Sequence, residues 1–581
     1  MVCPHVAEDV AQGSTGPHTI VASRWRTSRI ADLLTWSPLA LGGAYLLVVA
    51  IQFNQLIANT YLDADAASAP VIGQLYGGSP AHREVVLGQM TWFSTLMFEL
   101  ATRWLPLHRQ IWEAAPYAMA LASVALVAWG LWRIAGRWAA TIGAVIMVCA
   151  APHTLHLLFS LNDHSPTWFS FALLAGLLVL LERRAADLAV LPTVLAVVLV
   201  GAIVGANMAS DTLLIGAGVL PALLAVSVAW ALRPGRASRR AWWLMLDTIV
   251  VAGVCDALTG ALMSHENVGA PPGITHTGLA AGEAVASNFK LWWQSIAVLG
   301  NGDFFGQSLG FTSALQVVCA ALSILAVAVL VPRISWRELA RDVQRRLGGP
   351  ADGGSRQLNP GRADAEGAAP AVEGGAARVA WCAFWGSSAV LLSVGFIVSS
   401  TPVDINSDRY LVGLLFAAAA LIPLLAGRSV LRQVAITACT MVFAFTGLVQ
   451  LLQGQATANI SNFPTDTVSA EVARIARREH ATIGYAGYWD AAPITWSTHF
   501  GVKVYPVQAC GPALCPVSLH YITSWYIPRR GQRSFLISDP TQPGSTLSVP
   551  SLGSPTAVYH VGALTMSVYS YDIASHMVPT P

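Results

Sequence analysis

The chain has 581 residues, of which 54% are hydrophobic and 11% charged, and its mean hydropathy is +0.55. Soluble globular domains carry about 25% charged residues, so this composition excludes an ordinary soluble protein and predicts a polytopic α-helical membrane protein. The formal net charge of +2 comes from basic residues scattered over short loops, which argues against a nucleic-acid partner.

Apolar runs of roughly 17–22 residues have the length that a bilayer core requires, and the chain contains about eleven of them. The segments on one side of the predicted membrane carry 21 of the 33 Lys and Arg residues, against five in the loops on the other side before the C-terminal region. Basic loops stay cytoplasmic, so this asymmetry predicts a cytoplasmic N-terminus and an extracytoplasmic C-terminus in the plasma (inner) membrane. The runs lie near residues 38–58, 113–132, 138–159, 167–182, 188–206, 212–232, 242–262, 312–331, 379–398, 410–426 and 431–451.

The predicted organisation has three parts. Residues 1–35 are polar and are expected to form a disordered cytoplasmic tail. Residues 36–452 are expected to form the transmembrane domain, interrupted by a Gly-, Ala- and Pro-rich cytoplasmic linker at 348–378. Residues 453–581 combine a helical pattern at 465–480 with several short strand patterns, which predicts a small extracytoplasmic α/β domain.

Two cysteines of the C-terminal region, Cys510 and Cys515, form the only close cysteine pair of the sequence. They predict a disulfide if the region faces an oxidising compartment. A metal clip is the weaker alternative, because no second pair of ligands accompanies them. The aromatic residues of the region, Tyr488 among them, fit either a buried core or a surface that stacks on sugar rings.

Two aspartates directly follow the first apolar run, in the sequence Asn59-Thr-Tyr-Leu-Asp63-Ala-Asp65. A carboxylate pair at this position can take a proton from a hydroxyl or hold a divalent cation beside a phosphate. Their spacing points the two side chains in different directions, so one can enter a cavity while the other caps a helix or binds a cation. We expect both to be catalytic, with Asp63 slightly preferred as the base and Asp65 as the candidate ligand of Mg²⁺ or Mn²⁺.

Further polar groups fall on the same predicted outer face, namely Asp163, Asp211, Arg409 and Tyr410. Each alone fits a helix cap or an interfacial anchor. Ionisable groups held at membrane depth are costly, however, and they mark functional sites. Their gathering on one face therefore favours a substrate site there.

The layout resembles that of the GT-C glycosyltransferases, a family that includes protein O-mannosyltransferases and the aminoarabinose transferases of lipid A. The resemblance covers roughly residues 38–452. Members have a cytoplasmic N-terminus, one span, and an external loop that opens with an acidic motif, which Asp63-Ala-Asp65 matches. Interfacial helices and an arginine then precede the second span, as residues 85–104 and Arg109 do here. The apolar residues of this segment at helical spacing predict an amphipathic helix that lies in the membrane interface or packs on the bundle, and in either place covers a cavity. They are Trp92, Phe93, Leu96, Met97 and Leu100.

A late Arg-Tyr entering a span, with a proline further along, is also typical of the family and is matched by Arg409-Tyr410 and Pro423. The sequence departs from the family after the fifth span, where Asp211 stands near the place of a basic residue. An acidic residue is usual near the entry to the fourth span, and Asp163 lies close to that register.

The resemblance implies a sugar donor carried on a polyprenyl phosphate and bound from the bilayer, with a cell-envelope glycan, lipid or protein as acceptor. An aspartate would act as the general base and the anomeric carbon would be inverted. Asp163, Arg109, Arg409 and Tyr410 would then bind substrate. A transporter or flippase of a lipid-linked precursor is a rival, although no repeat between the two halves is evident. The second alternative is a non-catalytic membrane scaffold whose C-terminal domain binds a cell-wall partner.

Overall fold

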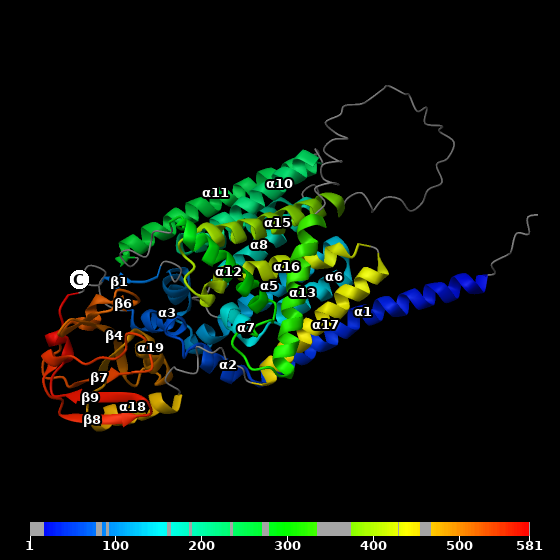
Figure 1. Ribbon diagram of the computed structural model, residues 1–581. Helices are drawn as coiled ribbons and strands as arrows, with labels where there is room; N and C mark the ends of the chain where they lie inside the picture. The colour runs from blue at the N-terminus through cyan, green and yellow to red at the C-terminus, as the bar shows by residue number, and fades with distance from the viewer. Residues whose placement is uncertain are drawn as a thin grey trace, which may run out of the picture.

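A bundle of long helices carries a smaller sheet domain at one end (Figure 1). The computed structural model describes residues 17–76, 84–88, 92–159, 164–184, 189–232, 236–269, 278–333, 374–427, 429–453 and 466–579. Helix α1 (Pro17–Ile51) runs out from the bundle on the side away from the sheet domain, and it begins inside the segment expected to be a disordered tail. Most of the predicted linker, residues 348–373, lies outside the described residues.

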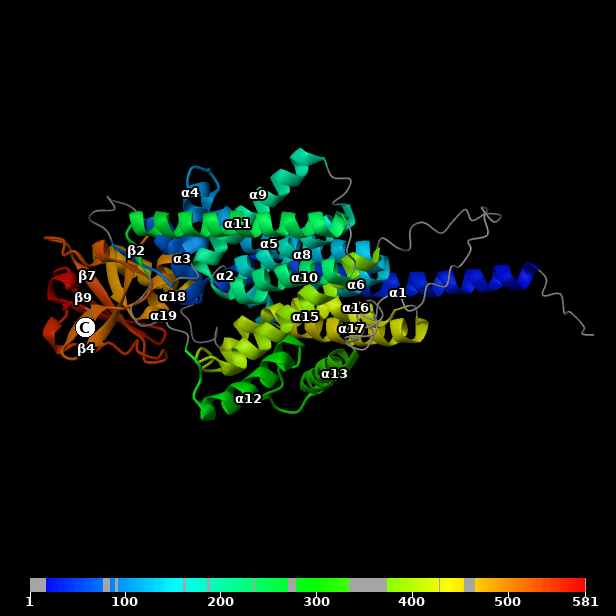
Figure 2. The ribbon, with the colours of Figure 1, turned by 90° about the horizontal axis from the view of Figure 1, so that it is seen from above.

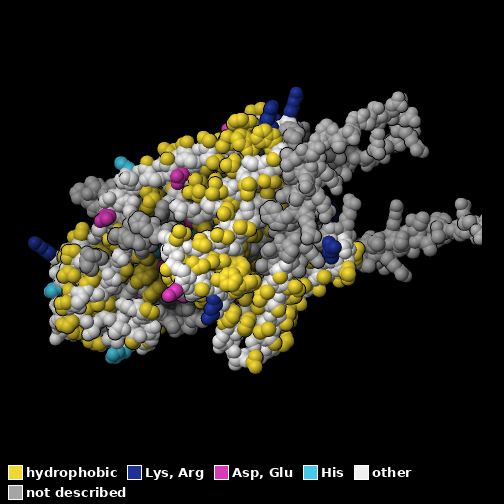
Figure 3. Space-filling model, turned by 45° about the horizontal axis from the view of Figure 1, so that its top comes forward, with side chains coloured by type: hydrophobic (Ala, Val, Ile, Leu, Met, Phe, Trp, Pro, Cys, Tyr) yellow, Lys and Arg dark blue, Asp and Glu magenta, His cyan; other side chains and the backbone are white. Residues whose placement is uncertain are grey.

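Nine helices of the described ranges are long and apolar enough to cross a membrane. Hydrophobic side chains cover the face of the bundle shown in Figure 3, where Lys, Arg, Asp and Glu are sparse. The nine are α1, α5 (His108–Ala135), α8 (Ser165–Arg184), α9 (Val190–Ser210), the π-turn η4 (Ile215–Val219) with α10 (Leu220–Leu232), α11 (Arg236–His265), α15 (Gly374–Val398), the 3-10 turn η5 (Ile405–Leu411) with α16 (Val412–Leu425), and α17 (Val430–Leu452).

One of the eleven predicted spans differs from expectation. Helices α6 (Arg137–Val148) and α7 (Pro152–Phe159) replace a single third span and meet at a bend of 96°. Pro152 explains the break, because proline lacks the amide hydrogen that would continue α6 and is favoured at the start of a new helix. Helix α13 (Phe311–Arg333) coincides with the eighth predicted run, and its described apolar stretch is Phe311–Ala326. Within the described residues the count is therefore nine, or ten if the bent pair is one span.

Close backbone contacts hold parts of the bundle together. Along α9, a Cβ added at Gly205 would lie 2.2 Å from the carbonyl oxygen of Ala252 in α11, and one at Gly201 would lie 2.8 Å from that of Thr248. Glycines four residues apart let two helices approach in this way, and the contact stabilises helix pairs that lipid alone would not drive together. Helices α12 (Gly282–Leu299) and α13 lie on the opposite side of the bundle (Figure 2).

Short helices cover the end of the bundle that faces the sheet domain. They are α2 (Phe53–Thr60), α3 (Ala64–Leu75), the π-turn η3 (Phe93–Met97) and α4 (Phe98–Thr102). Within residues 85–104, β1 (Val85–Val86) is a strand, and the residues at helical spacing from Trp92 onward form η3 and α4. The rest packs on the protein: η3 contacts α3, and the Phe93 amide donates to Ser210 Oγ at 2.6 Å.

The C-terminal domain is an α/β fold around a six-stranded sheet of order β5-β4-β3-β7-β9-β8. The central strand β3 is parallel to both β4 and β7, while the outer pairs are antiparallel. The predicted helix at 465–480 is present as α18, whereas α19, β5 and β8 were not predicted. The elements are α18 (Asp466–Arg478), β3 (Ile483–Ala486), α19 (Tyr488–Ser497), β4 (Lys503–Cys510), β5 (Ala513–Pro516), η7 (Thr523–Tyr526), β7 (Ser534–Ser538), η8 (Pro550–Leu552), β8 (Ala557–Val561), β9 (Leu564–Tyr569) and η9 (Ile573–His576).

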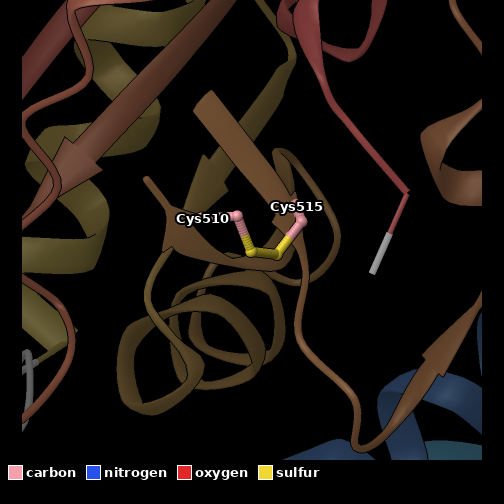
Figure 4. The surroundings of a disulfide bond; sticks show 2 residues. All are labelled: Cys510 and Cys515. Atoms are coloured by element: carbon pink, nitrogen blue, oxygen red, sulfur yellow. A yellow bond between two sulfur atoms is a disulfide. The ribbon is translucent and has the colours of Figure 1, made fainter. Parts of the chain in front are cut away.

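A disulfide joins Cys510 at the end of β4 to Cys515 in β5, across the hairpin that links these strands (Figure 4). Helix α19 packs on α3, and the Tyr61 ring lies 4.8 Å from that of Trp496. The apolar core of the sheet domain thus continues into the short helices at this end of the bundle.

A second, three-stranded sheet joins the C-terminal domain to the segments that follow helices α3 and α11. Its order is β2-β1-β6, with β2 at Val268–Gly269 and β6 at Tyr521–Ile522. Val85 in β1 pairs with Val268 in β2 and with Ile522 in β6. This sheet holds in place the residues that follow β1 and the residues that precede β6. Both segments reach the site described next.

Candidate functional site

The two predicted aspartates begin helix α3. Asp63 is its N-cap, with an extended backbone, and its Oδ1 accepts a hydrogen bond from the Asp65 amide at 2.8 Å. Aspartate is favoured at this position because its carboxylate satisfies an amide that the helix leaves open. The capping geometry turns the two side chains apart, and they remain 23% and 26% exposed.

Asp65 joins three segments that are remote in sequence. Its Oδ1 accepts a hydrogen bond from the Tyr488 hydroxyl of α19, and its Oδ2 lies 3.8 Å from Arg409 Nη1 of η5. Two predicted site residues, Asp65 and Arg409, therefore meet at the end of the bundle that faces the sheet domain. The third partner, Tyr488, comes from the C-terminal domain.

Three consecutive residues of η5 point to three different neighbours. Asp408 Oδ2 lies 2.7 Å from His153 Nε2, Arg409 faces Asp65, and the Tyr410 ring lies 5.1 Å from that of His164. A 3-10 helix has three residues per turn, so successive side chains diverge by about 120°. One short turn can therefore direct three successive side chains toward three different parts of the same site.

Helix α7 supplies two histidines that the sequence reading did not assign. His153 contacts Asp408, and His156 Nε2 lies 3.6 Å from Asp63 Oδ2. The bend before Pro152 turns α7 so that these residues, three apart on one face, reach both carboxylates. Asp408 is fully buried, and within the described part of the chain its Oδ1 has no hydrogen-bond partner. The signal available in the sequence was the pair of histidines following a proline in an apolar run.

Asp211 anchors a neighbouring polar cluster. Its Oδ2 accepts hydrogen bonds from His164 Nδ1, at 2.6 Å, and from the Thr167 hydroxyl. Its Oδ1 accepts from the Leu213 amide at 3.0 Å. A buried carboxylate satisfied by three donors is a fixed structural charge. It holds His164 against the ring of Tyr410.

Tyr488 and His520 complete the surroundings of Asp65. The Tyr488 oxygen lies 2.9 Å from His520 Nδ1. Burial and the adjacent Asp65 raise the pKa of Tyr488 well above its ordinary value. Burial lowers the pKa of His520 to about 4, so both groups are neutral at pH 7. No local pattern in the sequence connects either residue with Asp65.

The structure does not bring every predicted residue to this cluster. Arg109 Nε binds Glu113 Oε1 at 2.8 Å, and its guanidinium lies 4.6 Å from the ring centroid of Trp496, eight residues or about 12 Å along α19 from Tyr488. Asp163 lies outside the described residues. Among the residues that are described, no three His, Cys, Asp or Glu side chains gather as metal ligands, and the cation at Asp65 stays a prediction.

A small apolar groove shares helix α7 with this cluster. Its only polar lining group, the Tyr45 hydroxyl, donates a hydrogen bond to the Ala150 carbonyl. Leu155 and Leu158 face the groove, on another side of α7 from the two histidines. The lining residues are Tyr45, Leu46, Val49, Ala120, Leu121, Val124, Met147, Val148, Leu155, Leu158 and Phe416.

No protein-family model and no curated protein matches the chain. Two solved structures are similar to it, both of ArnT from Cupriavidus metallidurans. The apo structure is 14% identical, with a TM-score of 0.41, over 93% of this chain and 100% of that one. The structure bound to undecaprenyl phosphate is 12% identical, with a TM-score of 0.47, over 90% of this chain and 98% of that one.

Proposed function

We propose that this protein is an inverting glycosyltransferase of the inner membrane that moves a sugar from a polyprenyl-phosphate donor to a hydroxyl of an extracytoplasmic acceptor. The observation that carries the proposal is the meeting of Asp63, Asp65 and Arg409 beside an apolar groove. Glycosyl transfer from a lipid phosphate needs a base, a cation for the leaving phosphate, and an apolar track for the lipid. The cluster and the groove offer all three around helix α7.

Arg409 is assigned to the donor phosphate. Its Nη1 lies 3.8 Å from Asp65, whereas a direct charge-assisted hydrogen bond would be about 2.7–2.9 Å. A phosphate oxygen can therefore share this edge of the guanidinium, whose planar fork matches phosphate geometry. Tyr410, the next residue, supplies a second candidate donor and stacks 5.3 Å from the Arg409 guanidinium.

Asp63 is assigned to the base. The Asp65 amide fixes its Oδ1, while its Oδ2 lies 3.6 Å from His156, beyond direct hydrogen-bond length. An acceptor hydroxyl can bind at Oδ2 and give its proton to Asp63 as its oxygen bonds to the anomeric carbon. The bond between that carbon and the phosphate oxygen breaks on the opposite side. Polyprenyl phosphate then leaves with its charge held by Arg409.

The groove is assigned to the polyprenyl chain. Its wall is apolar, and it reaches the polar cluster through α7. A chain that enters from the bilayer is already out of water, so the groove would hold it by van der Waals packing. The orientation that fits is the one predicted from the basic residues, with the N-terminus cytoplasmic and the site extracytoplasmic.

Membranes containing the protein, incubated with radiolabelled polyprenyl-phosphate sugars and cell-envelope acceptors, test the proposal. Label should move to the acceptor fraction, and Asp63→Asn should slow the transfer by roughly 10²–10⁴-fold. Asp466→Asn, at the exposed start of α18, is the matched control and should transfer at the wild-type rate. Movement of intact donor across the membrane without transfer would instead identify a flippase.

A further inference from the structure

The break between α6 and α7 leaves polar backbone groups in an apolar stretch of the bundle. Cys149, Ala150 and Ala151 separate the two helices, and all three are buried. Backbone groups at such a place are not hydrated, so they need partners from the protein itself. The Ala150 carbonyl accepts a hydrogen bond from the Tyr45 hydroxyl. The Cys149 carbonyl and the Ala151 amide need another partner.

One side chain, that of Asn301, binds both of these groups. Its Oδ1 accepts a hydrogen bond from the Ala151 amide at 2.6 Å, and its Nδ2 donates to the Cys149 carbonyl at 2.8 Å. Nδ2 also donates to the Phe443 carbonyl of α17 at 2.9 Å. Asn301 is fully buried. Its amide thus provides, from the α12–α13 loop, hydrogen bonds that a continuous helix would make within itself.

The backbone explains why an asparagine can stand at this position. Helix α12 ends in a Schellman motif, in which the Gly302 amide donates to the Ala297 carbonyl at 2.7 Å and the Asn301 amide to the Val298 carbonyl at 3.0 Å. Asn301 has φ of +62°, at the left-handed position of this motif, where glycine is usual and asparagine is tolerated. Because glycine would meet the backbone requirement at lower cost, what asparagine adds is its side-chain amide.

Helix α17 is fitted to the same junction. A Cβ added at Gly447 would lie 2.2 Å from the Cys149 carbonyl oxygen and 2.9 Å from Asn301 Nδ2. Gln450, further along α17, donates from its Nε2 to the Asn301 carbonyl at 3.1 Å. The start of α7 is therefore held by α17 and by the α12–α13 loop together.

We infer that Asn301 is a positioning residue, which fixes the angle between α6 and α7 and thereby holds His156 at Asp63. The inference rests on the proposed function. Helix α7 begins one residue after Ala151, so loss of the Asn301 amide lets this helix turn about its start. His156 Nε2, now 3.6 Å from Asp63 Oδ2, would then move relative to the assigned base. A misplacement of about 1 Å in such a site can slow a reaction by roughly 10²-fold.

Hydrogen exchange of the full-length protein in detergent tests the hold on α7 without any substrate. Asn301→Gly keeps the left-handed turn and removes only the side-chain amide. Amides of residues 149–159 should then exchange roughly tenfold faster than in the wild type, while exchange in the other helices stays unchanged. Asn301→Asp keeps an acceptor for the Ala151 amide but loses donor capacity, so its exchange should fall between the two.

Thr437→Val is the matched control. It loses a 3.1 Å hydrogen bond from Trp138 Nε1, which joins α6 to α17 on the other side of the bend from α7. Its exchange at residues 149–159 should equal that of the wild type. Wild-type exchange at these residues in Asn301→Gly would overturn the inference. Faster exchange over the whole bundle would also overturn it, because the loss would then be one of general stability.

Transfer kinetics in membranes test the consequence for the reaction. Asn301→Gly should lower kcat roughly tenfold. His156→Ala should lower kcat as well, and adding Asn301→Gly to it should cost less than about twofold more, because the contact with Asp63 is already lost. Asn301→Asp should recover part of the kcat that Asn301→Gly loses. Fully additive losses, or wild-type kcat in Asn301→Gly, would overturn the positioning role.

Failure of the proposed function gives a different result. Faster local exchange in Asn301→Gly, with no transfer by the wild-type protein, would overturn the glycosyltransferase and leave the hold of Asn301 on α7 established. Active transfer with unchanged exchange would overturn the role of Asn301 alone. If Asn301→Gly does not fold, Asn301→Asp takes its place, and its exchange at residues 149–159 must exceed that of the wild type for the inference to survive.

Discussion

Replacing Arg409 should weaken donor binding more than it disturbs the fold. The side chain is 29% exposed and enters from a 3-10 turn whose capping box, built on Asp404, does not involve it. Hydrogen bonds to charged groups contribute about 1.5–3 kcal/mol, which corresponds to roughly 10- to 150-fold in affinity. Because solvent screens a partly exposed cation, we expect Arg409→Gln to raise the Kd for polyprenyl phosphate by the lower part of that range.

A second comparison removes the neighbouring carboxylate, Asp65, instead of the cation. At 3.8 Å and an effective dielectric constant of about 20, the attraction between Arg409 and Asp65 is about 4 kcal/mol before desolvation and screening reduce it. A phosphate must share the guanidinium with this carboxylate. Removing the carboxylate in Asp65→Asn should therefore leave the Kd unchanged or lower it, opposite in sign to the effect of Arg409→Gln.

Equilibrium binding of labelled polyprenyl phosphate to the purified protein measures both effects. Arg409→Lys should fall between the wild type and Arg409→Gln, because lysine keeps the charge but lacks the planar fork. Arg432→Gln, at an exposed position of α17, serves as the matched control and should bind like the wild type. Wild-type affinity in Arg409→Gln would refute the assignment of the phosphate to this residue.

Four further results are expected. Val124→Trp, which fills the apolar groove, should raise the KM for a long-chain donor but not for a short-chain analogue, as kinetics with the two donors will show. Burial, together with the nearby Asp539 carboxylate, raises the pKa of Asp490 from 3.8 to about 7. Between about pH 4 and 7 the folded protein therefore keeps a proton on Asp490 that the unfolded chain has lost. The free energy of unfolding consequently falls as the pH rises through that window. Thermal unfolding should accordingly show that the melting temperature falls less between pH 5 and pH 8 in Asp490→Asn than in the wild type. Cys510→Ser should lower the free energy of unfolding of the C-terminal domain by about 2 kcal/mol, measured by denaturant unfolding, and mass spectrometry of the wild type should find no free thiol at that position. A reporter active only in the cytoplasm, fused after Pro581, should be silent, and a signal would reverse the predicted topology.

The sequence by itself determined the features that depend on local physics. A bilayer core demands long apolar runs, so each predicted run coincides with a helix or a helix pair of the bundle. The wrong part was the third run, where a 96° bend follows from Pro152 but its angle depends on packing. Asp63, Asp65 and Arg409 could be placed on one face, because topology alternates sides from span to span. The disulfide partners are five residues apart, close enough for the sequence to suggest the pair.

Only the tertiary structure decided which of these groups touch. Asp65 and Tyr488 are 423 residues apart, and no periodicity in either segment encodes their hydrogen bond. It depends on the docking of α19 on α3 and on the small sheet that ties β6 to β1. The same holds for His153 and Asp408, which meet because α7 is turned and η5 directs successive side chains apart. Residue types and spacing predict which chemistry is available, whereas the packing of remote segments decides which side chains share one site.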